Sequence, residues 1–309
     1  MTTKVAVVTG SNKGLGFSLV KGLCQNLNGI VYLTSRDEKR GLEACKKLKE
    51  IGISPEFHRL NITDDKSIQE FVGFIRKRHE KIDILINNAG VLFLKDALEP
   101  KLYQAEQTLL VNFYSLVNFT EAMLPLIKDN GTILNISSSS GHLSRIPSDE
   151  LRNRISAIDL TLENLKGMMQ EYNIETVKLN TDVEEWGSSP YVVSKVAVNA
   201  YTFMLNRRLI SRNIRVNCVH PGYVKSDMTH GVGSVSPDQG AMIPLHIALH
   251  PEDGGLLIAR CSTTWRRCTR PGAGGLLGGQ SRGAWGWCCR HRCPSSPSDR
   301  RRPIAASWV

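Results

Sequence analysis

The stretch Val5-Ala-Val-Val-Thr9-Gly10-Ser-Asn-Lys-Gly14-Leu-Gly16 lies near the start of a chain of 309 residues. Its apolar first half predicts a buried parallel strand, and the pattern that follows predicts a helix over Gly14–Cys24. Gly10 permits a tight turn between them, while Gly14 and Gly16 let a phosphate approach the free N–H groups that begin the helix. The spacing is GxxxGxG, which an ordinary strand-to-helix turn also allows, so the motif alone is weak evidence for a dinucleotide site.

Apolar runs and amphipathic helical patterns alternate along the chain. This alternation predicts an α/β fold, a Rossmann-type doubly wound parallel sheet of about seven strands in a single domain. We expect helices at Lys39–Ile51, at Asp65–Arg78 and across Glu99–Ile127, the last broken once near Pro100–Tyr103. The expected strands are Val5–Thr9, Ile30–Ser35, Phe57–Leu60, Ile82–Ile86, Thr132–Ser137, Ile214–His220 and, as a short last strand, Gly255–Ala259.

One segment interrupts the alternation: the residues between Ser137 and Tyr191 contain no strand pattern. Ser148–Ala157 and Leu160–Tyr172 predict two short helices within it. A long insertion beside a proposed site is usually a lid or a wall for a substrate. We therefore expect a helical insertion, at about residues 141–186, before the helix that carries Tyr191.

The formal net charge of +10 comes mainly from one end of the chain. Residues 260–309 hold ten Arg and a single acid, Asp299, and the rest is nearly balanced, with 29 basic and 28 acidic residues. The folded part is therefore not expected to bind nucleic acid. The same end holds five Cys and four Trp without helical or strand periodicity. We expect a domain at 1–259 and a disordered tail at 260–309.

Two other interpretations of the tail are weaker. An RNA-binding arm would need the interleaved basic and aromatic residues of a known module, which the tail lacks. A metal site would have to use Cys288, Cys289, His291 and Cys293, which lack paired CxxC spacing, so no metal is expected;.

The remaining cysteines, Cys24, Cys45 and Cys218, have the pattern of ordinary thiols in a reducing compartment;. No apolar run reaches the length of a membrane span, and no signal peptide precedes the first strand. We expect a cytoplasmic protein without a membrane segment.

Tyr191 and Lys195 lie one helical turn apart in Tyr191-Val-Val-Ser-Lys195;. A phenol with an ordinary pKa of ~10 is a poor proton shuttle at neutral pH. A nearby ammonium group lowers that pKa, and a positively charged nicotinamide lowers it further. Such a pair is often only a solvated surface pair. Together with the glycine turn upstream, however, it predicts a dinucleotide-dependent carbonyl reductase.

The second predicted strand ends in Thr34-Ser35-Arg36, where an NAD site usually carries an acid that binds the ribose 2′-hydroxyl;. Arg36 and Lys13, with help from Arg40, instead offer positive charge to a 2′-phosphate. An ordinary surface position for Arg36 is the alternative. We expect NADPH as the cofactor.

Polar residues also follow two of the central strands. Ser138 could polarise a carbonyl group, although its neighbours in the serine run, Ser137, Ser139 and Ser140, leave the identity of this group open by one residue. Asn87 and Asn88 either fix backbone and cap helices or border the adenine ribose.

Taken in order, these motifs resemble those of the short-chain dehydrogenases/reductases, and in detail the NADPH-dependent carbonyl reductase branch. The plant menthone- and salutaridine-type reductases share the same pattern, including the long insertion. The resemblance covers roughly residues 4–259. It rests on Thr9–Gly16, Asn87–Gly90, Asn135–Ser138, Tyr191–Lys195 and Pro221-Gly222.

The resemblance implies a role for each matching residue. Tyr191 would protonate the carbonyl oxygen, and Lys195 would bind the nicotinamide ribose and lower the pKa of the phenol. Ser138 would hydrogen-bond the substrate oxygen, and Asn112 would hold a water of a proton relay. His142 and Trp186, with Leu143, Ile146 and Tyr223, would line the substrate site, although ordinary packing explains each equally. The implied cofactor-binding residues are Gly10, Asn12, Lys13, Gly14, Leu15, Gly16, Arg36, Asn61, Ile62, Asn88, Ala89, Gly90, Tyr191, Lys195, Pro221, Gly222, Val224 and Ser226.

The chain departs from the family pattern at three places. Asn61 stands where an Asp commonly accepts from the adenine amino group; an amide oxygen can also accept, so we expect binding to survive. His220 stands where some animal members have a Cys, so no cysteine-linked regulation is expected there. After about Ala259 the tail replaces a segment that normally helps to close the substrate side.

These observations predict a monomeric enzyme that reduces ketones, aldehydes or quinones to alcohols with NADPH. The monomer follows from the resemblance, because the insertion would cover the helix surface through which many related reductases form tetramers. The alternative is a catalytically impaired NADP-binding sensor or scaffold, inactivated by the altered C-terminus. The sequence does not predict the physiological substrate.

Overall fold

The computed structural model describes residues 3–94, 96–179 and 184–250. Within them, all strand pairs are parallel and form a single sheet in the order β3-β2-β1-β4-β5-β6. The winding direction reverses between β1 and β4, and the crevice at the carboxyl ends of these strands is where doubly wound folds bind ligands. The strands are β1 (Lys4–Val8), β2 (Gly29–Ser35), β3 (Glu56–Arg59), β4 (Ile82–Asn87), β5 (Ile127–Ile136) and β6 (Arg215–Val219).

The strands form where the sequence is continuously apolar, because helices cover both faces of the sheet. The α/β prediction is confirmed, with the predicted strands matching to within a residue or two, except for β5. That strand begins at Ile127 rather than Thr132. Ile127 pairs with Ile82, and the register then shifts before Thr132 pairs with Ile84. The residues between Ile127 and Thr132 are largely polar, so the apolar pattern did not predict the first pair. The expected strand Gly255–Ala259 lies outside the described residues.

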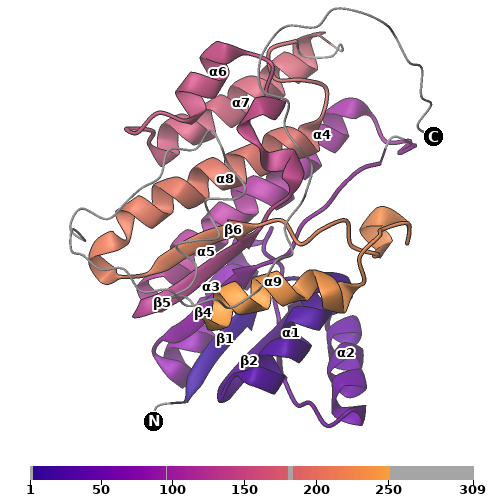
Figure 1. The fold of residues 1–309 in the computed structure, drawn as a ribbon, viewed down its shortest axis with the longest axis vertical. Helices are drawn as coiled ribbons and strands as arrows, with labels where there is room; N and C mark the ends of the chain where they lie inside the picture. The colour runs from indigo at the N-terminus through magenta and orange to yellow at the C-terminus, as the bar shows by residue number, and fades with distance from the viewer. Residues whose placement is uncertain (1–2, 95, 180–183, 251–309) are drawn as a thin grey trace, which may run out of the picture. The chain divides into compact units, whose positions relative to one another are not determined.

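Two helical layers cover the sheet (Figure 1). On one face, α1, α2 and α9 pack against residues such as Val8, Leu33 and Ile86. On the other face, α3, α5 and α8 pack against Val7 and Leu85. The helices are α1 (Gly14–Asn26), α2 (Glu38–Glu50), α3 (Asp65–His79), α4 (Lys101–Leu109), α5 (Leu116–Met123), α6 (Asp149–Ile155), α7 (Leu162–Leu179), α8 (Pro190–Arg208) and α9 (Pro237–Leu249).

The helical stretch after β4 differs from its prediction. It is not broken near Pro100–Tyr103; α4 begins there, directly after Pro100. The irregularity is instead a π-helical segment, η1 (Leu110–Ser115), between α4 and α5. By length and mean hydropathy (1.2), Lys101–Leu126 could span a membrane, but 56% of its most apolar window is buried in the protein, as in the core helix of a folded domain.

The predicted insertion is helical, and its α7 runs further than expected, from Leu162 to Leu179. It lies over α8 and α4 (Figure 1). Inside the insertion, the rings of Tyr172 and Trp186 meet edge to face with their centroids 5.7 Å apart, and both are buried. Because α7 covers its outer side, α8 is buried on every face from Val192 to Thr202.

Two glycines provide a test of this packing. Gly29 pairs with Lys4 at the start of β2, and a Cβ added there would lie 2.0 Å from the Lys4 carbonyl oxygen. Gly73 lies in α3, and a Cβ there would meet nothing within 4 Å. Gly29→Ala should destabilise the protein by roughly 1–3 kcal/mol. Gly73→Ala should stabilise it by roughly 0.5–1 kcal/mol, because alanine favours helix. Urea unfolding measures both, and equal effects would contradict the β1–β2 register.

Candidate active site

The turn after β1 requires its glycines for two separate reasons. Gly10 and Gly14 adopt positive φ angles of 59° and 56°, which residues other than glycine rarely adopt;. Gly16 is crowded instead, because an added Cβ would lie 2.5 Å from the Asn88 amide nitrogen and 2.7 Å from the Gly10 oxygen. Helix α1 can therefore approach the segment after β4 as closely as backbone allows.

Asn88 fastens this turn from the neighbouring strand end. Its amide nitrogen donates to the carbonyl oxygens of Thr9 (3.0 Å) and Gly10 (2.9 Å). In return, the Thr9 hydroxyl accepts from the backbone N–H groups of Asn88 (2.9 Å) and Ala89 (3.0 Å). Asn88 thus fixes the backbone of the turn, as one of its two interpretations predicted.

The start of α1 is free to accept an anion. Lys13 stands at the N-cap without a side-chain capping bond, and the first turn carries no acid. The free N–H groups and the helix dipole therefore favour a negative charge at this position. Together with the crowded glycines, this is the environment that a pyrophosphate needs, so the residues present fit a dinucleotide.

The carboxyl end of β5 meets α8 at Ser138 and Tyr191. Ser189 caps α8 by accepting from the Val192 N–H, and Tyr191 follows in its first turn. Ser138 lies close enough to the Tyr191 phenol to lower its pKa. The adjacent Ser137 instead donates to the buried Asn199 side chain at 2.7 Å. Ser137 is thus bonded within the core, and the role of Ser138 toward a substrate stays a prediction.

Lys195 lies below Tyr191, almost wholly inside the protein. Its ammonium group donates to the Ile136 carbonyl oxygen at 2.9 Å and lies 5.6 Å from the centre of the Tyr191 ring. Only 6% of the residue is exposed. Burial disfavours the charged form and lowers the pKa of Lys195 from 10.5 to about 8;.

The Tyr191 phenol responds to the same burial in the opposite direction. Burial raises its pKa, because a phenolate is costly away from water, and the nearby Ser138 opposes this effect;. The sequence predicted a lowered value from the charge of Lys195 and of a bound nicotinamide. In the protein alone, desolvation outweighs the other influences.

Asn112 lies in η1, and its side chain spans two elements. The amide oxygen accepts from the Val91 N–H (2.8 Å), and the amide nitrogen donates to the Val91 oxygen (2.9 Å) and the Ser194 hydroxyl (3.2 Å). A Cβ on Gly90 would lie 3.2 Å from Asn112 and 3.9 Å from the Lys195 ammonium. The segment after β4 is thereby held against α8. A role in a proton relay stays a prediction.

The segment after β6 returns to the glycine turn. Gly222 has a φ of 90°, and Val224 forms a β-bridge with Val235. Ser226 begins a short helical turn, and a Cβ on Gly14 would lie 3.7 Å from the Ser226 Cβ. The structure thus brings Pro221–Ser226 beside the start of α1.

Asp227 follows Ser226, and the sequence analysis did not identify it as a site residue. Its carboxylate lies 2.5 Å from the ammonium of Lys13, across the opening between the two segments. Arg40 pairs with Asp37 at 3.5 Å, and the Arg36 side chain is exposed. The basic group predicted for a 2′-phosphate therefore includes an unexpected acid.

Asn61 follows β3, and its side-chain oxygen is already occupied. It accepts from the Thr63 N–H (3.2 Å) and the Thr63 hydroxyl (2.9 Å). Because the backbone group can only donate, the atom facing it must be the oxygen. The amide therefore has its NH₂ group left to offer a ligand, rather than the acceptor that the sequence suggested. Ile62 beside it is buried.

The candidate substrate residues divide by burial. Leu143, Ile146 and Trp186 are buried, as ordinary packing would require, whereas Tyr223 is exposed and His142 is half-buried. The Nδ1 atom of His142 lies 2.6 Å from the Ser144 hydroxyl. Their role in binding a substrate stays a prediction.

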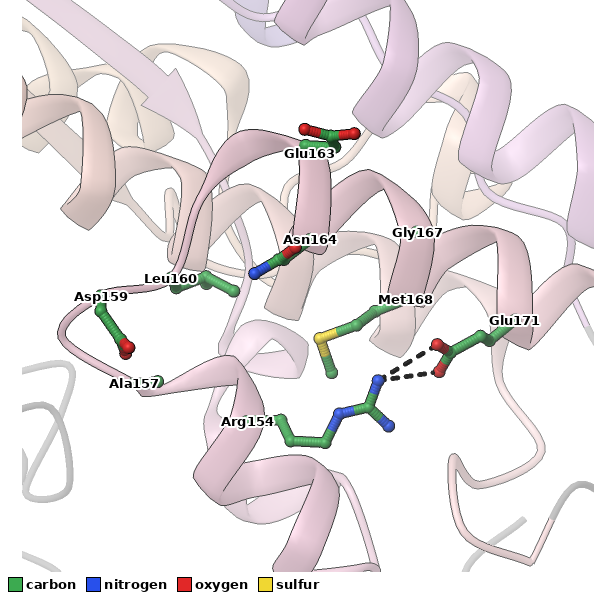
Figure 2. Close-up of a pocket in the computed structure, with 9 residues that line it drawn as sticks. All are labelled: Arg154, Ala157, Asp159, Leu160, Glu163, Asn164, Gly167, Met168 and Glu171. Atoms are coloured by element: carbon green, nitrogen blue, oxygen red, sulfur yellow. Dashed lines mark hydrogen bonds and ion pairs between the residues drawn. The ribbon is translucent and has the colours of Figure 1, made fainter.

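A hollow of about 460 Å³ lies between α6 and α7, and Figure 2 shows the residues that line it. Arg154 and Glu171 form an ion pair at one end (3.0 Å), and Asp159 and Glu163 lie at the other. None of the candidate catalytic residues lines it. In the described part of the chain, no group of three or more His, Cys, Asp and Glu is arranged to hold a metal ion.

Comparisons with known proteins agree with this geometry. Residues 4–148 match the family described as short chain dehydrogenase, and residues 153–261 match that described as enoyl-(acyl carrier protein) reductase. Carbonyl reductase (NADPH) 3 of Rattus norvegicus is 37% identical over 274 residues, covering 85% of this chain and 99% of its own. Carbonyl reductase (NADPH) 1 of Sus scrofa is 38% identical over 256 residues, covering 81% and 89%. The structure of salutaridine reductase from Papaver somniferum is 32% identical, with a TM-score of 0.75, covering 81% and 97%.

The burial of Lys195 predicts a pH-dependent stability. Its proton is held up to pH 10.5 in the unfolded chain but only to about pH 8 in the folded protein. Between these values unfolding takes up a proton, so rising pH should stabilise the fold, by about 3 kcal/mol in total. Lys195→Met should lose this rise, whereas the exposed control Lys66→Met should keep it. Urea unfolding across this window is the measurement, and parallel curves for all three proteins would contradict a buried ammonium.

Because the side-chain oxygen of Asn61 is occupied, Asn61→Asp should bind the cofactor more tightly. One carboxylate oxygen would accept from Thr63, and the other would be free to accept from an adenine amino group. One additional hydrogen bond corresponds to about two- to tenfold tighter binding. NADPH and NADH should gain equally, because both carry adenine. Asn61→Ala is the control that should show no gain, and an Asp variant that binds no tighter would place the adenine elsewhere.

Proposed function

The chain belongs to the short-chain dehydrogenase/reductase family, and on that basis we propose that it reduces a carbonyl group of a small molecule with Tyr191 as the general acid. Its cofactor is NADPH, which supplies the hydride. The substrate class that we propose is a ketone, an aldehyde or a quinone, which becomes an alcohol. The observation that carries the proposal is the buried Lys195 ammonium, which lies 5.6 Å from the centre of the Tyr191 ring at the carboxyl end of β5.

We assign the cofactor to the crevice between β1 and β4. The free N–H groups at the start of α1 bind the pyrophosphate, and Lys13 and Arg36 bind the 2′-phosphate. Lys195 and Tyr191 would hydrogen-bond the nicotinamide ribose, and Pro221, Gly222, Val224 and Ser226 would contact the carboxamide. Holding the two reactants face to face supplies much of the rate through orientation.

The proton comes from the Tyr191 hydroxyl. Ser138 donates to the same carbonyl oxygen and so aligns it with the phenol. Once the proton has left, the phenolate is stabilised by the nearby ammonium of Lys195, which burial makes more effective. Because burial alone raises the pKa of Tyr191, the phenol keeps its proton until substrate and cofactor are in place.

We further propose a monomer in the cytoplasm. The outer side of α8 is covered by α7, so the surface that could pair two copies is already buried within one chain. Cys24, Cys45 and Cys218 form no disulfide among the described residues, which fits a reducing compartment;.

The alternative function is an NADP-binding sensor or scaffold without useful turnover. It would retain the glycine turn and Lys195 but need no proton donor. NADPH oxidation against a panel of quinones, aldehydes, diones and ketones separates the two. Turnover of any of them by the full chain supports the enzyme, and tight NADPH binding with no turnover supports the sensor.

Tyr191→Phe should abolish turnover while NADPH binding is retained, because phenylalanine keeps the ring and lacks only the proton donor. A general acid contributes about 10²–10⁴-fold to the rate. Steady-state kinetics and cofactor fluorescence are the two measurements. Tyr103→Phe is the matched control, since Tyr103 is exposed on α4 and contacts Phe93. A Tyr191→Phe enzyme that keeps most of its rate would require a different acid.

A further inference from the structure

The Lys13–Asp227 ion pair joins two segments 214 residues apart, the glycine turn and the segment after β6. The ammonium and the carboxylate are 2.5 Å apart, and Arg40 also lies close enough to lower the pKa of Asp227. Lys13 is assigned to the 2′-phosphate, and the sequence predicts that Arg40 helps to bind it. The acid therefore faces the same cations that the cofactor's phosphate would use.

The pair is not needed to hold the segment in place. Its side chains are 58% and 77% exposed, and exposed pairs contribute little to stability;. The backbone around it is fixed independently, because Ser226 and Thr229 form a capping box and Lys225 donates to the Val235 oxygen at 2.8 Å. The effect of the Asp227 carboxylate is therefore electrostatic rather than structural.

A second acid in the same region, Asp238, does hold two helices together. Asp238, at the start of α9, pairs with Lys21 of α1 at 2.8 Å and accepts from the Ser18 hydroxyl at 2.6 Å. Its side chain lies on α1 beyond the glycine turn, and its partners are not in the group assigned to the phosphate. Asp238 thus has the same charge as Asp227 and a similar ion pair, but it does not lie beside the proposed cofactor site.

We propose that Asp227 is a specificity-determining residue that competes with the 2′-phosphate of NADPH for Lys13. This inference rests on the proposed placement of that phosphate at Lys13. To bind NADPH, Lys13 must leave the carboxylate, and Asp227 then repels the phosphate. NADH has no 2′-phosphate and makes no such demand. Asp227 therefore weakens NADPH binding selectively and eases release of the oxidised cofactor.

Asp227→Asn tests this on the full chain. The dissociation constants of NADPH and NADH are measured by cofactor fluorescence at low and high salt. We expect NADPH to bind about two- to fivefold tighter, the range of an exposed ion pair, and NADH to be unchanged. The gain should shrink at high salt, which screens exposed charges. Asp238→Asn, the matched control, should leave the ratio of the two constants unchanged.

Lys13→Met completes a double-mutant cycle. It should weaken NADPH selectively and remove the effect of Asp227→Asn. If it does weaken NADPH, yet Asp227→Asn leaves NADPH binding unchanged or weakens both cofactors equally, the competition is refuted and the pair is instead inert or a strap over the cofactor. If Lys13→Met leaves NADPH binding unchanged, the proposed phosphate position fails, and the inference with it.

Discussion

The buried ammonium of Lys195 is the constraint on which the site depends. A cation removed from water is costly, and in the described residues its hydrogen bond is to one backbone carbonyl, that of Ile136 at the end of β5;. The contact requires α8 to lie tightly on the sheet, and a Cβ on Gly141 would approach the Lys195 oxygen to 2.8 Å. It also requires α7 to exclude water from the outer side of α8. The insertion therefore keeps Lys195 buried in addition to covering the outer side of α8.

The same closeness organises the cofactor side. Gly16 and Asn88 bring two strand ends together, and Asn112 brings the segment after β4 to α8. The Asn88 side chain makes its hydrogen bonds to backbone groups, and that of Asn112 binds the Val91 backbone and the Ser194 hydroxyl. On the function proposed above, Asn112 and Asn88 would hold the groups that contact NADPH, and substitutions there would affect catalysis through position.

The sequence predicted those features of the fold and of the candidate site that a local pattern of residues determines. Buried parallel strands are apolar runs, and the glycine turn and the Tyr191–Lys195 spacing are local, so the sheet and the two halves of the site could be found. The π-helical segment η1 could not, because neither its place nor the contact of Asn112 with Val91 is encoded in a local pattern. The same holds for Asp227, which meets Lys13 only in the folded protein, and for Asn61, whose oxygen is taken by Thr63. The burial of Trp186 likewise depends on Tyr172, within an insertion whose packing no periodicity reveals.

On the proposed function, Lys195 and the bound nicotinamide together convert a buried phenol with a raised pKa into a proton donor. The ultraviolet absorbance of phenolate, titrated in the native protein and corrected with Tyr191→Phe, reports this pKa directly. The account predicts a high value in the protein alone and a clearly lower one with oxidised cofactor bound. An equal pKa in both states would contradict it, because the charges assigned to the phenol would then not act on it.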